Sequence, residues 1–374
     1  MPGDTGANLA AEGDRGGRPA AAHEARAPNL RAAVDWACAT EDRQLARALV
    51  GPVAAEVYLR SRSEIGDWAE RILAITPADD EELILFGLTW AARRYMRMLD
   101  REGYGRLVGR YGEPDHPMIR YARAFLDNDY KGRAESAAQS VTELRRRGEH
   151  YIADLNELVA VGLTLLMSGR LEEHDALVTA LVERYRVHGP PTALQWALTY
   201  LGISASVQGR HHDAAQFYEE ATGVDIPDRT HTLKNPLEAR AALRRGDRSR
   251  AFVLLRSYVD ELLANDNVYI GKFACIEFVG MMVRVGRRAE AARVLGFLES
   301  SDSIDVSVLR SRFAGDAGEI AIDFEQGMED ERKLGRDLDD RRALTYMRDV
   351  LDRLLADEPS RALSISQAAV ISPM

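Results

Sequence analysis

Five glycines recur along this 374-residue chain at nearly equal intervals. Gly132, Gly169, Gly209, Gly246 and Gly286 are separated by 37, 40, 37 and 40 residues. Between them, apolar residues return every three or four positions, which is the spacing of one buried helix face. A glycine that interrupts such a pattern once per period marks a tight turn between two helices. The period therefore predicts a chain built from stacked helix pairs.

The stretch Trp196–Ala221 shows one such pair most clearly. Small residues at Gly202 and Ala214 allow its two helices to approach closely, and Gly209 separates them. The pattern resembles a tetratricopeptide-type repeat, whose apolar face is buried only when neighbouring repeats stack on it. The sequence therefore predicts an all-α, tetratricopeptide-like solenoid of antiparallel helix pairs.

One repeat departs from the pattern of the others. An alanine follows the turn glycine by five residues in four repeats, at Ala137, Ala214, Ala251 and Ala291. The repeat after Gly169 has His174 at that position, so we interpret it as degenerate.

Composition divides the chain into three segments. Residues 1–27 contain no aromatic, Ile or Val residue, and we expect them to be disordered. The helical pattern runs over 28–357, which is predicted to form the solenoid. Residues 358–374 are predicted to be a flexible C-terminal tail.

Charge and cysteine content indicate which classes of binding partner and which cellular compartment to expect. The formal net charge is −10, which argues against direct nucleic-acid binding because phosphate contacts need clustered basic residues. No segment has the apolar length of a membrane span, and the N-terminus lacks the apolar core of a secretory signal. The two cysteines, Cys38 and Cys275, are too few for a disulfide framework. We therefore expect a cytoplasmic protein without membrane contact.

The sequence lacks the common motifs of catalysis and cofactor binding. It has neither a His-Glu-x-x-His nor a Cys-x-x-Cys pair for a metal, and no Gly-x-Ser-x-Gly nucleophile elbow. Its Gly271-Lys272 dipeptide is followed by Phe273, where a phosphate loop needs Ser or Thr. We expect no catalytic residues, no bound cofactor and no metal site.

Three segments resemble a known family. They are PNLRAAVDWACATEDRQLARALV at 28–50, RAEAARVLGFLES at 288–300 and GRDLDDRRALTYMRDVLDRLL at 335–355. Together they resemble the C-terminal helical region of actinobacterial signal-transduction ATPases, which include LuxR-type and AfsR-type regulators and cyclase-linked ATPases. The chain resembles that sensor region without the ATPase and DNA-binding modules.

The resemblance implies a non-catalytic binding or sensor module in signal transduction or transcription regulation. Such a module docks a protein, a peptide or a small ligand on its helical-repeat surface. An alternative is a helical subunit that acts in trans with a separate signal-transduction ATPase or transcription regulator. An enzyme whose site is assembled from separated helices also stays open, as does a homo-oligomer.

In a tetratricopeptide array, the first helix of each repeat lines the inner surface. When the same face is assigned to the first helices of the repeats predicted here, it contains nine candidate partner-binding residues: Trp196, Thr199, Ile203, Ser206, Val159, Leu163, Leu166, Phe273 and Ile276. Their apolar character is typical of a groove for an amphipathic helix or an extended peptide. The alternative is that the helices wind tightly and bury this face.

Overall fold

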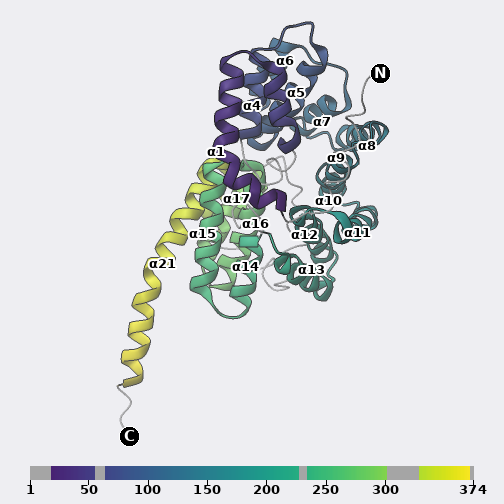
Figure 1. Cartoon of the computed structure of the whole chain (residues 1–374). Coiled ribbons are helices and arrows are strands. Elements are labelled where there is room, and N and C mark those ends of the chain that lie inside the picture. Colours follow the sequence, from purple (N-terminus) through teal and green to yellow (C-terminus); the bar gives the residue numbers. More distant parts are fainter. Residues whose placement is uncertain (1–17, 55–63, 227–233, 301–327, 371–374) are drawn as a thin grey trace. The chain divides into compact units, whose positions relative to one another are not determined.

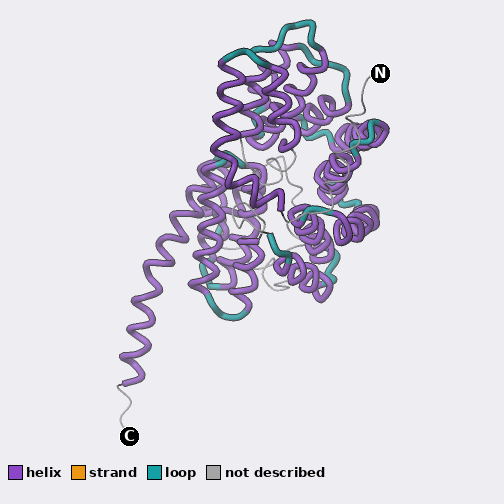
Figure 2. Tube along the Cα trace, in the orientation of Figure 1, coloured by secondary structure: helices purple, strands orange, loops and turns teal. Residues whose placement is uncertain are grey.

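A computed structural model describes residues 18–54, 64–226, 234–300 and 328–370 of the chain. Within these ranges every regular element is a helix and there is no strand, which confirms the predicted all-α class (Figures 1 and 2). The chain divides into two compact units, Met1–Thr232 and Leu233–Met374. The solenoid predicted over 28–357 spans this division.

The first unit is a succession of helices joined by short turns (Figure 1). Packing is mainly between elements that follow one another, such as Glu64–Ala74 with Glu81–Met98 and Pro191–Val207 with His211–Gly223. Its elements are α1 (Arg18–Ala39), α2 (Arg43–Val50), the short turn η2 (Gly51–Val53), α4 (Glu64–Ala74), α5 (Glu81–Met98), α6 (Arg101–Tyr111), α7 (Pro117–Leu126), α8 (Tyr130–Arg146), α9 (His150–Asn156), η3 (Glu157–Gly162), α10 (Leu163–Met167), α11 (Leu171–His188), α12 (Pro191–Val207) and α13 (His211–Gly223).

The second unit contains α14 (Lys234–Arg244), α15 (Arg248–Ala264), α16 (Val268–Arg284), α17 (Arg288–Ser300), α20 (Glu329–Arg336) and α21 (Asp340–Val370). Here α17 packs closely on α20, and the first part of α21 covers α15 and α16. Leu344, Met347 and Leu351 of α21 are buried, as expected from their spacing of three and four residues.

Helical backbone extends into both segments that were predicted to be unstructured. The first helix begins at Arg18, within the segment 1–27, in a stretch that contains the helix-favouring residues Ala20–Ala22. The last helix continues to Val370, past the predicted start of the tail at 358. Residues 1–17 and 371–374 lie outside the described residues.

One type of turn recurs between consecutive helices in the described ranges. A residue with positive φ ends a helix, and the next residue begins the following helix while its N–H bonds the carbonyl five residues back. This is the Schellman arrangement, in which a left-handed residue lets the last carbonyls of a helix be satisfied. In the described ranges it occurs nine times, at Glu41, Leu99, Asn128, Gly148, Gly169, Gly209, Gly246, Asp266 and Gly286.

Four of the five predicted turn glycines occupy this position, and the prediction is wrong for Gly132. That glycine lies inside α8, where its N–H donates to Asp129 Oδ1 over 2.9 Å. The left-handed residue of that turn is Asn128, with φ 56°. Asparagine tolerates this conformation because its short polar side chain bonds locally, so a search for glycine alone misplaces the turn by four residues.

The residue five positions after the left-handed one is buried in each repeat. Ala214, Ala251 and Ala291 are at most 3% exposed. Counted from Asn128, the corresponding residue is Arg133 rather than Ala137, and in the degenerate repeat it is His174; these are 2% and 0% exposed. The turns at Asn128 and Gly169 are thus followed by a large buried polar side chain at the position where the turns at Gly209, Gly246 and Gly286 are followed by alanine.

Ion pairs join side chains that are about one repeat apart in sequence. Asp175 binds Arg210 at a separation of 35 residues, and Arg186 binds Glu220 at a separation of 34. In the second unit, Arg240 binds Glu277 at a separation of 37 residues. Among the described residues, six more ion pairs have separations between 33 and 38: Arg31–Glu64, Arg43–Asp80, Arg47–Glu82, Asp35–Arg71, Glu299–Arg332 and Arg293–Glu331.

The helix that best matched the repeat pattern, α12, is buried around most of its circumference. Every residue from Thr192 to Ser206 is buried except Leu194. It packs against α11 and α13. Even so, none of the helices described here is both long and apolar enough to cross a bilayer.

Candidate functional site

The described residues depart most from regular helix geometry in the helix pair His150–His188, which corresponds to the repeat that the sequence predicts to be degenerate. Its first helix consists of α9, η3 and α10, and the middle element η3 is a π-helix. Such wider turns are rare in proteins and are frequent at functional sites. The π-helix packs against α8 on one side and α11 on the other.

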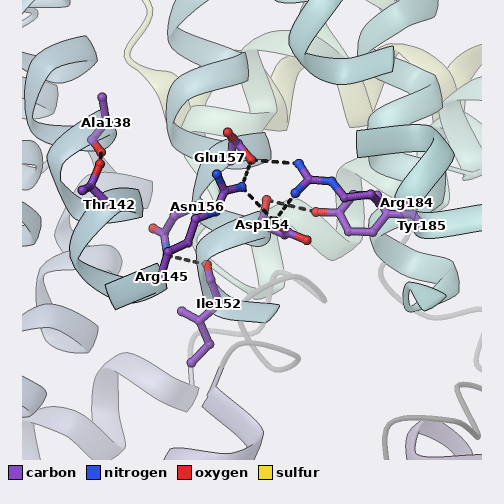
Figure 3. A network of polar contacts seen from close by, with 9 residues as sticks. All are labelled: Ala138, Thr142, Arg145, Ile152, Asp154, Asn156, Glu157, Arg184 and Tyr185. Carbon is purple, nitrogen blue, oxygen red and sulfur yellow. Dashed lines mark hydrogen bonds and ion pairs between the residues drawn. The ribbon is translucent and has the colours of Figure 1, made fainter. Parts of the chain in front are cut away.

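Four charged side chains form a closed ring around the start of the π-helix (Figure 3). Arg145 Nη2 donates to Asp154 Oδ1 over 3.1 Å and to Glu157 Oε2 over 2.5 Å. Arg184 binds the same two oxygen atoms, through Nη1 over 2.9 Å and Nη2 over 3.0 Å. We name these four residues the ionic ring. It ties α8 and α11 to the helix between them.

The carboxylates are the less exposed members of the ionic ring. The side chains of Asp154 and Glu157 are 20% and 15% exposed, whereas those of Arg145 and Arg184 are 38% and 45% exposed. Two positive and two negative charges cancel, and each carboxylate is bound by both guanidinium groups. Hydrogen bonds between charged groups are stronger than neutral ones, so the ring holds this part of the helix firmly.

Neutral hydrogen bonds extend the network on both sides. Tyr185 donates from its hydroxyl to the Asp154 carbonyl over 3.0 Å. Burial, and then the charge of Asp154, raises the pKa of Tyr185 well above its usual value. Asn156 Oδ1 accepts from Arg93 Nη2 over 2.9 Å, and Asn156 and Arg93 are both buried. Arginines from α5, α8 and α11 thus bind Asp154, Asn156 and Glu157, three side chains within about one helical turn at the start of the π-helix.

A second polar cluster lies at the opposite end of α11. Asp175 binds His174 Nδ1 over 3.0 Å, Gln208 Nε2 over 2.9 Å and Arg210 Nη2 over 2.6 Å. Burial opposes ionisation of Asp175, but hydrogen bonds from His174, Ser204 and Gln208 outweigh it and lower its pKa. Since the ionised carboxylate is acceptor-only, His174 donates from Nδ1. Its buried Nε2 has no hydrogen-bond partner.

Both clusters consist of charged and polar side chains that bind one another. In the part of the chain that the structure describes, no group of three His, Cys, Asp or Glu residues is arranged to hold a metal ion. Every carboxylate of the ionic ring is engaged by arginine. The ionic ring links α8 and α11 to the helix that lies between them in sequence.

Eight of the nine residues predicted to bind a partner are buried, and Phe273 is half-buried. Trp196 is 8% exposed and meets Tyr200 edge-on, with ring centroids 5.8 Å apart. Val159 lies in the π-helix, and Leu163 and Leu166 follow it in α10. Thr199, Ile203 and Ser206 lie in α12, and Ile276 belongs to the second unit. This burial favours the alternative of a tightly wound array, and a partner contact by these residues stays a prediction.

Sequence reasoning missed the ionic ring and the second polar cluster. One signal was present, because His174 was recognised as an exception to the alanine pattern. The ionic ring left no comparable mark, since its members look like ordinary solvent-facing charges on amphipathic helices.

Comparison with known proteins adds no relative: no family model, no curated protein and no solved structure matches this chain.

Proposed function

We propose that this chain is a cytoplasmic, non-catalytic binding or sensor module of a regulatory pathway, built as a tetratricopeptide-like solenoid that docks a protein or peptide. The observation that supports the proposal best is the set of ion pairs about one repeat apart, such as Asp175–Arg210 and Arg240–Glu277. Pairs at this separation are expected when each repeat contacts the next, and stacked repeats form extended binding surfaces.

Exposed apolar side chains mark one place for the partner. Tyr151 is 43% exposed and precedes Asp154 by one turn of α9; Val187 is 68% exposed and follows Arg184 by one turn of α11. Because the turn at Gly169 makes the two helices of this repeat antiparallel, the start of α9 and the end of α11 lie at the same end. Tyr151 and Val187 therefore flank the ionic ring, and we name these two residues the apolar pair.

The partner class follows from the resemblance of the sequence to regulator sensor regions. It is a separate signal-transduction ATPase or transcription regulator that supplies the modules this chain does not resemble. Polar side chains around two exposed apolar ones suit a protein surface of mixed character.

Binding should depend on the apolar pair. Tagged wild-type chain and the Tyr151→Ala and Val187→Ser variants would be used to capture purified ATPase and regulator candidates from the same genome. We expect each variant to weaken capture at least about tenfold while its melting temperature is unchanged. Val253→Ser is the matched control, since Val253 is 52% exposed on α15 of the second unit. If the Tyr151→Ala and Val187→Ser variants captured the partner as well as the Val253→Ser control does, this docking surface would be contradicted.

A nucleotide-binding assay addresses the broader proposal. The isolated chain should not bind ATP, because the phosphate-loop pattern is broken after Lys272 by Phe273. Saturable ATP binding by the purified chain would contradict a purely docking role.

A further inference from the structure

The first helix of the degenerate repeat contains one residue more than its counterparts. Left-handed turn residues delimit the regular helices α8, α15 and α16, and each of these helices has 17 residues. The helix between the turns at Gly148 and Gly169 is made of α9, η3 and α10, with 7, 6 and 5 residues. The spacing of the turn residues agrees, because Asp266 and Gly286 are 20 apart but Gly148 and Gly169 are 21 apart.

The π-helix accommodates this additional residue. A π turn holds one residue more than an α turn, so the two halves of the helix keep the positions that a regular 17-residue helix would give them. In a regular helix of the same sequence, α9 would instead be displaced by about 1.5 Å along the axis and turned by about 100° relative to α10. Two registers of α9 are thus available to one sequence.

The observed register is held by contacts on α9 and at the first π residue. Glu157 and Asp154 bind the two arginines of the ionic ring, and Asn156 binds Arg93. The other half is held by packing, because every residue from Leu163 to Met167 is buried. Packing holds α9 less completely, because its first two residues are exposed and only Ala153, Leu155 and Asn156 of its seven residues are buried. A change of register would therefore move α9 and leave α10 in place.

We propose that Glu157–Gly162 is a register switch: α9 exchanges between the π register and a regular α register, and the ionic ring holds it in the π register. The switch controls the docking surface, because Tyr151 lies on α9 and turns with it; this consequence rests on the proposed function. A partner that contacts Tyr151 beside Val187 binds only the π register. Its binding therefore shifts the equilibrium toward the π register, to an extent set by the difference in its affinity for the two registers.

Hydrogen–deuterium exchange of the full chain tests the switch without any partner. Glu157→Gln weakens both arginine contacts of the first π residue, so amides 150–162 should exchange roughly tenfold faster while those of α16 keep the wild-type rate. Glu143→Gln is the matched control, because Glu143 also binds two arginines, Arg146 and Arg147, but within and just after its own helix. It should leave exchange at 150–162 unchanged.

Deletion of Ala160, a buried residue in the middle of η3, tests the origin of the π turn. The shortened helix should be regular, and its amides should exchange as slowly as those of α16. The proposal is overturned if Glu157→Gln leaves exchange at 150–162 at the wild-type rate, or if it accelerates exchange equally in α12 and α16. If the deletion variant does not fold, the exchange rates of the Glu157→Gln variant alone test the proposal.

Partner capture separates this inference from the proposed function. Suppose that amides 150–162 exchange faster in the Glu157→Gln variant, while the Tyr151→Ala variant captures the partner as well as wild type does. This result would support the switch and contradict the docking surface. Unchanged exchange in the Glu157→Gln variant, together with weaker capture by the Tyr151→Ala variant, would contradict the switch and support the docking surface.

Discussion

Gly296 of α17 lies so close to Arg332 of α20 that a Cβ atom on Gly296 would be 2.1 Å from the carbonyl oxygen of Arg332. The approach is reciprocal, because a Cβ on Gly335 would be 1.8 Å from the carbonyl oxygen of Arg293. Both contacts are to backbone, which cannot move aside as the end of a side chain can. Two glycines thus allow α17 and α20 to cross at backbone contact.

Gly296→Ala should separate these two helices. Overpacking of this kind costs roughly 1–3 kcal/mol of the free energy of unfolding, which urea denaturation measures. Gly280→Ala in α16 is the control, because a Cβ there meets nothing within 4 Å. That change should be neutral or stabilise by about 0.5–1 kcal/mol, as alanine does in a helix interior. Equal stability of the two variants would contradict the close crossing.

Gly209→Val should strain the turn between α12 and α13. Gly209 has φ 73°, and a Cβ there would meet nothing within 4 Å, so the cost arises from backbone conformation alone. We expect a loss of roughly 1–3 kcal/mol in the free energy of unfolding. Gly209→Asn should lose less, because Asn128 adopts the same conformation in its own turn. Identical melting of both variants and wild type would contradict this assignment.

Asp175 should contribute stability that depends on pH. Its pKa in the folded chain is lowered, so its ionised form stabilises the fold above the unfolded pKa of about 3.9, and this contribution is lost as the pH falls through the folded value. Asp175→Asn should therefore lower the free energy of unfolding at pH 7. The difference from wild type should shrink in urea denaturation below about pH 4. A difference that is constant between pH 7 and pH 3 would show that ionisation is not the cause.

Trp196→Ala distinguishes a core role from a groove role. Because Trp196 is 8% exposed and packs on Tyr200, we expect a loss of roughly 3–5 kcal/mol, visible as a lower melting temperature. Trp196→Phe should lose clearly less, since it keeps a ring in the site. An unchanged melting temperature with loss of partner binding would instead support the predicted groove.

The helical class and most of the turns could be predicted because they depend on local chemistry. Apolar spacing identified the buried face of α21, and glycine identified the turns at Gly169, Gly209, Gly246 and Gly286. The turns with Leu99 or Asp266 as the left-handed residue were not predicted, because leucine rarely adopts that conformation and one aspartate among many indicates it only weakly. There the surrounding packing decides the conformation, and a local pattern does not contain that information.

The candidate site was harder to predict because its members are far apart in sequence. Arg145, Asp154 and Arg184 each look like a solvent-facing charge when read along their own helix. They meet only because α8, α9 and α11 pack together. The π-helix was equally hidden, since Glu157–Gly162 continues an apolar helical pattern without a break.

The Schellman turns have a consequence for how this protein tolerates changes in length. The residue that completes one helix end also begins the next helix, as Arg170 and Asp247 do, so these connections contain no spare residue. An additional residue next to such a turn either breaks the hydrogen bonds that close the turn or enters a helix and alters the hydrogen-bonding pattern of that helix. The π-helix Glu157–Gly162, which lies between the turns at Gly148 and Gly169, is an alteration of the second kind. In such a chain, gain or loss of a single residue changes which side chains face a neighbour.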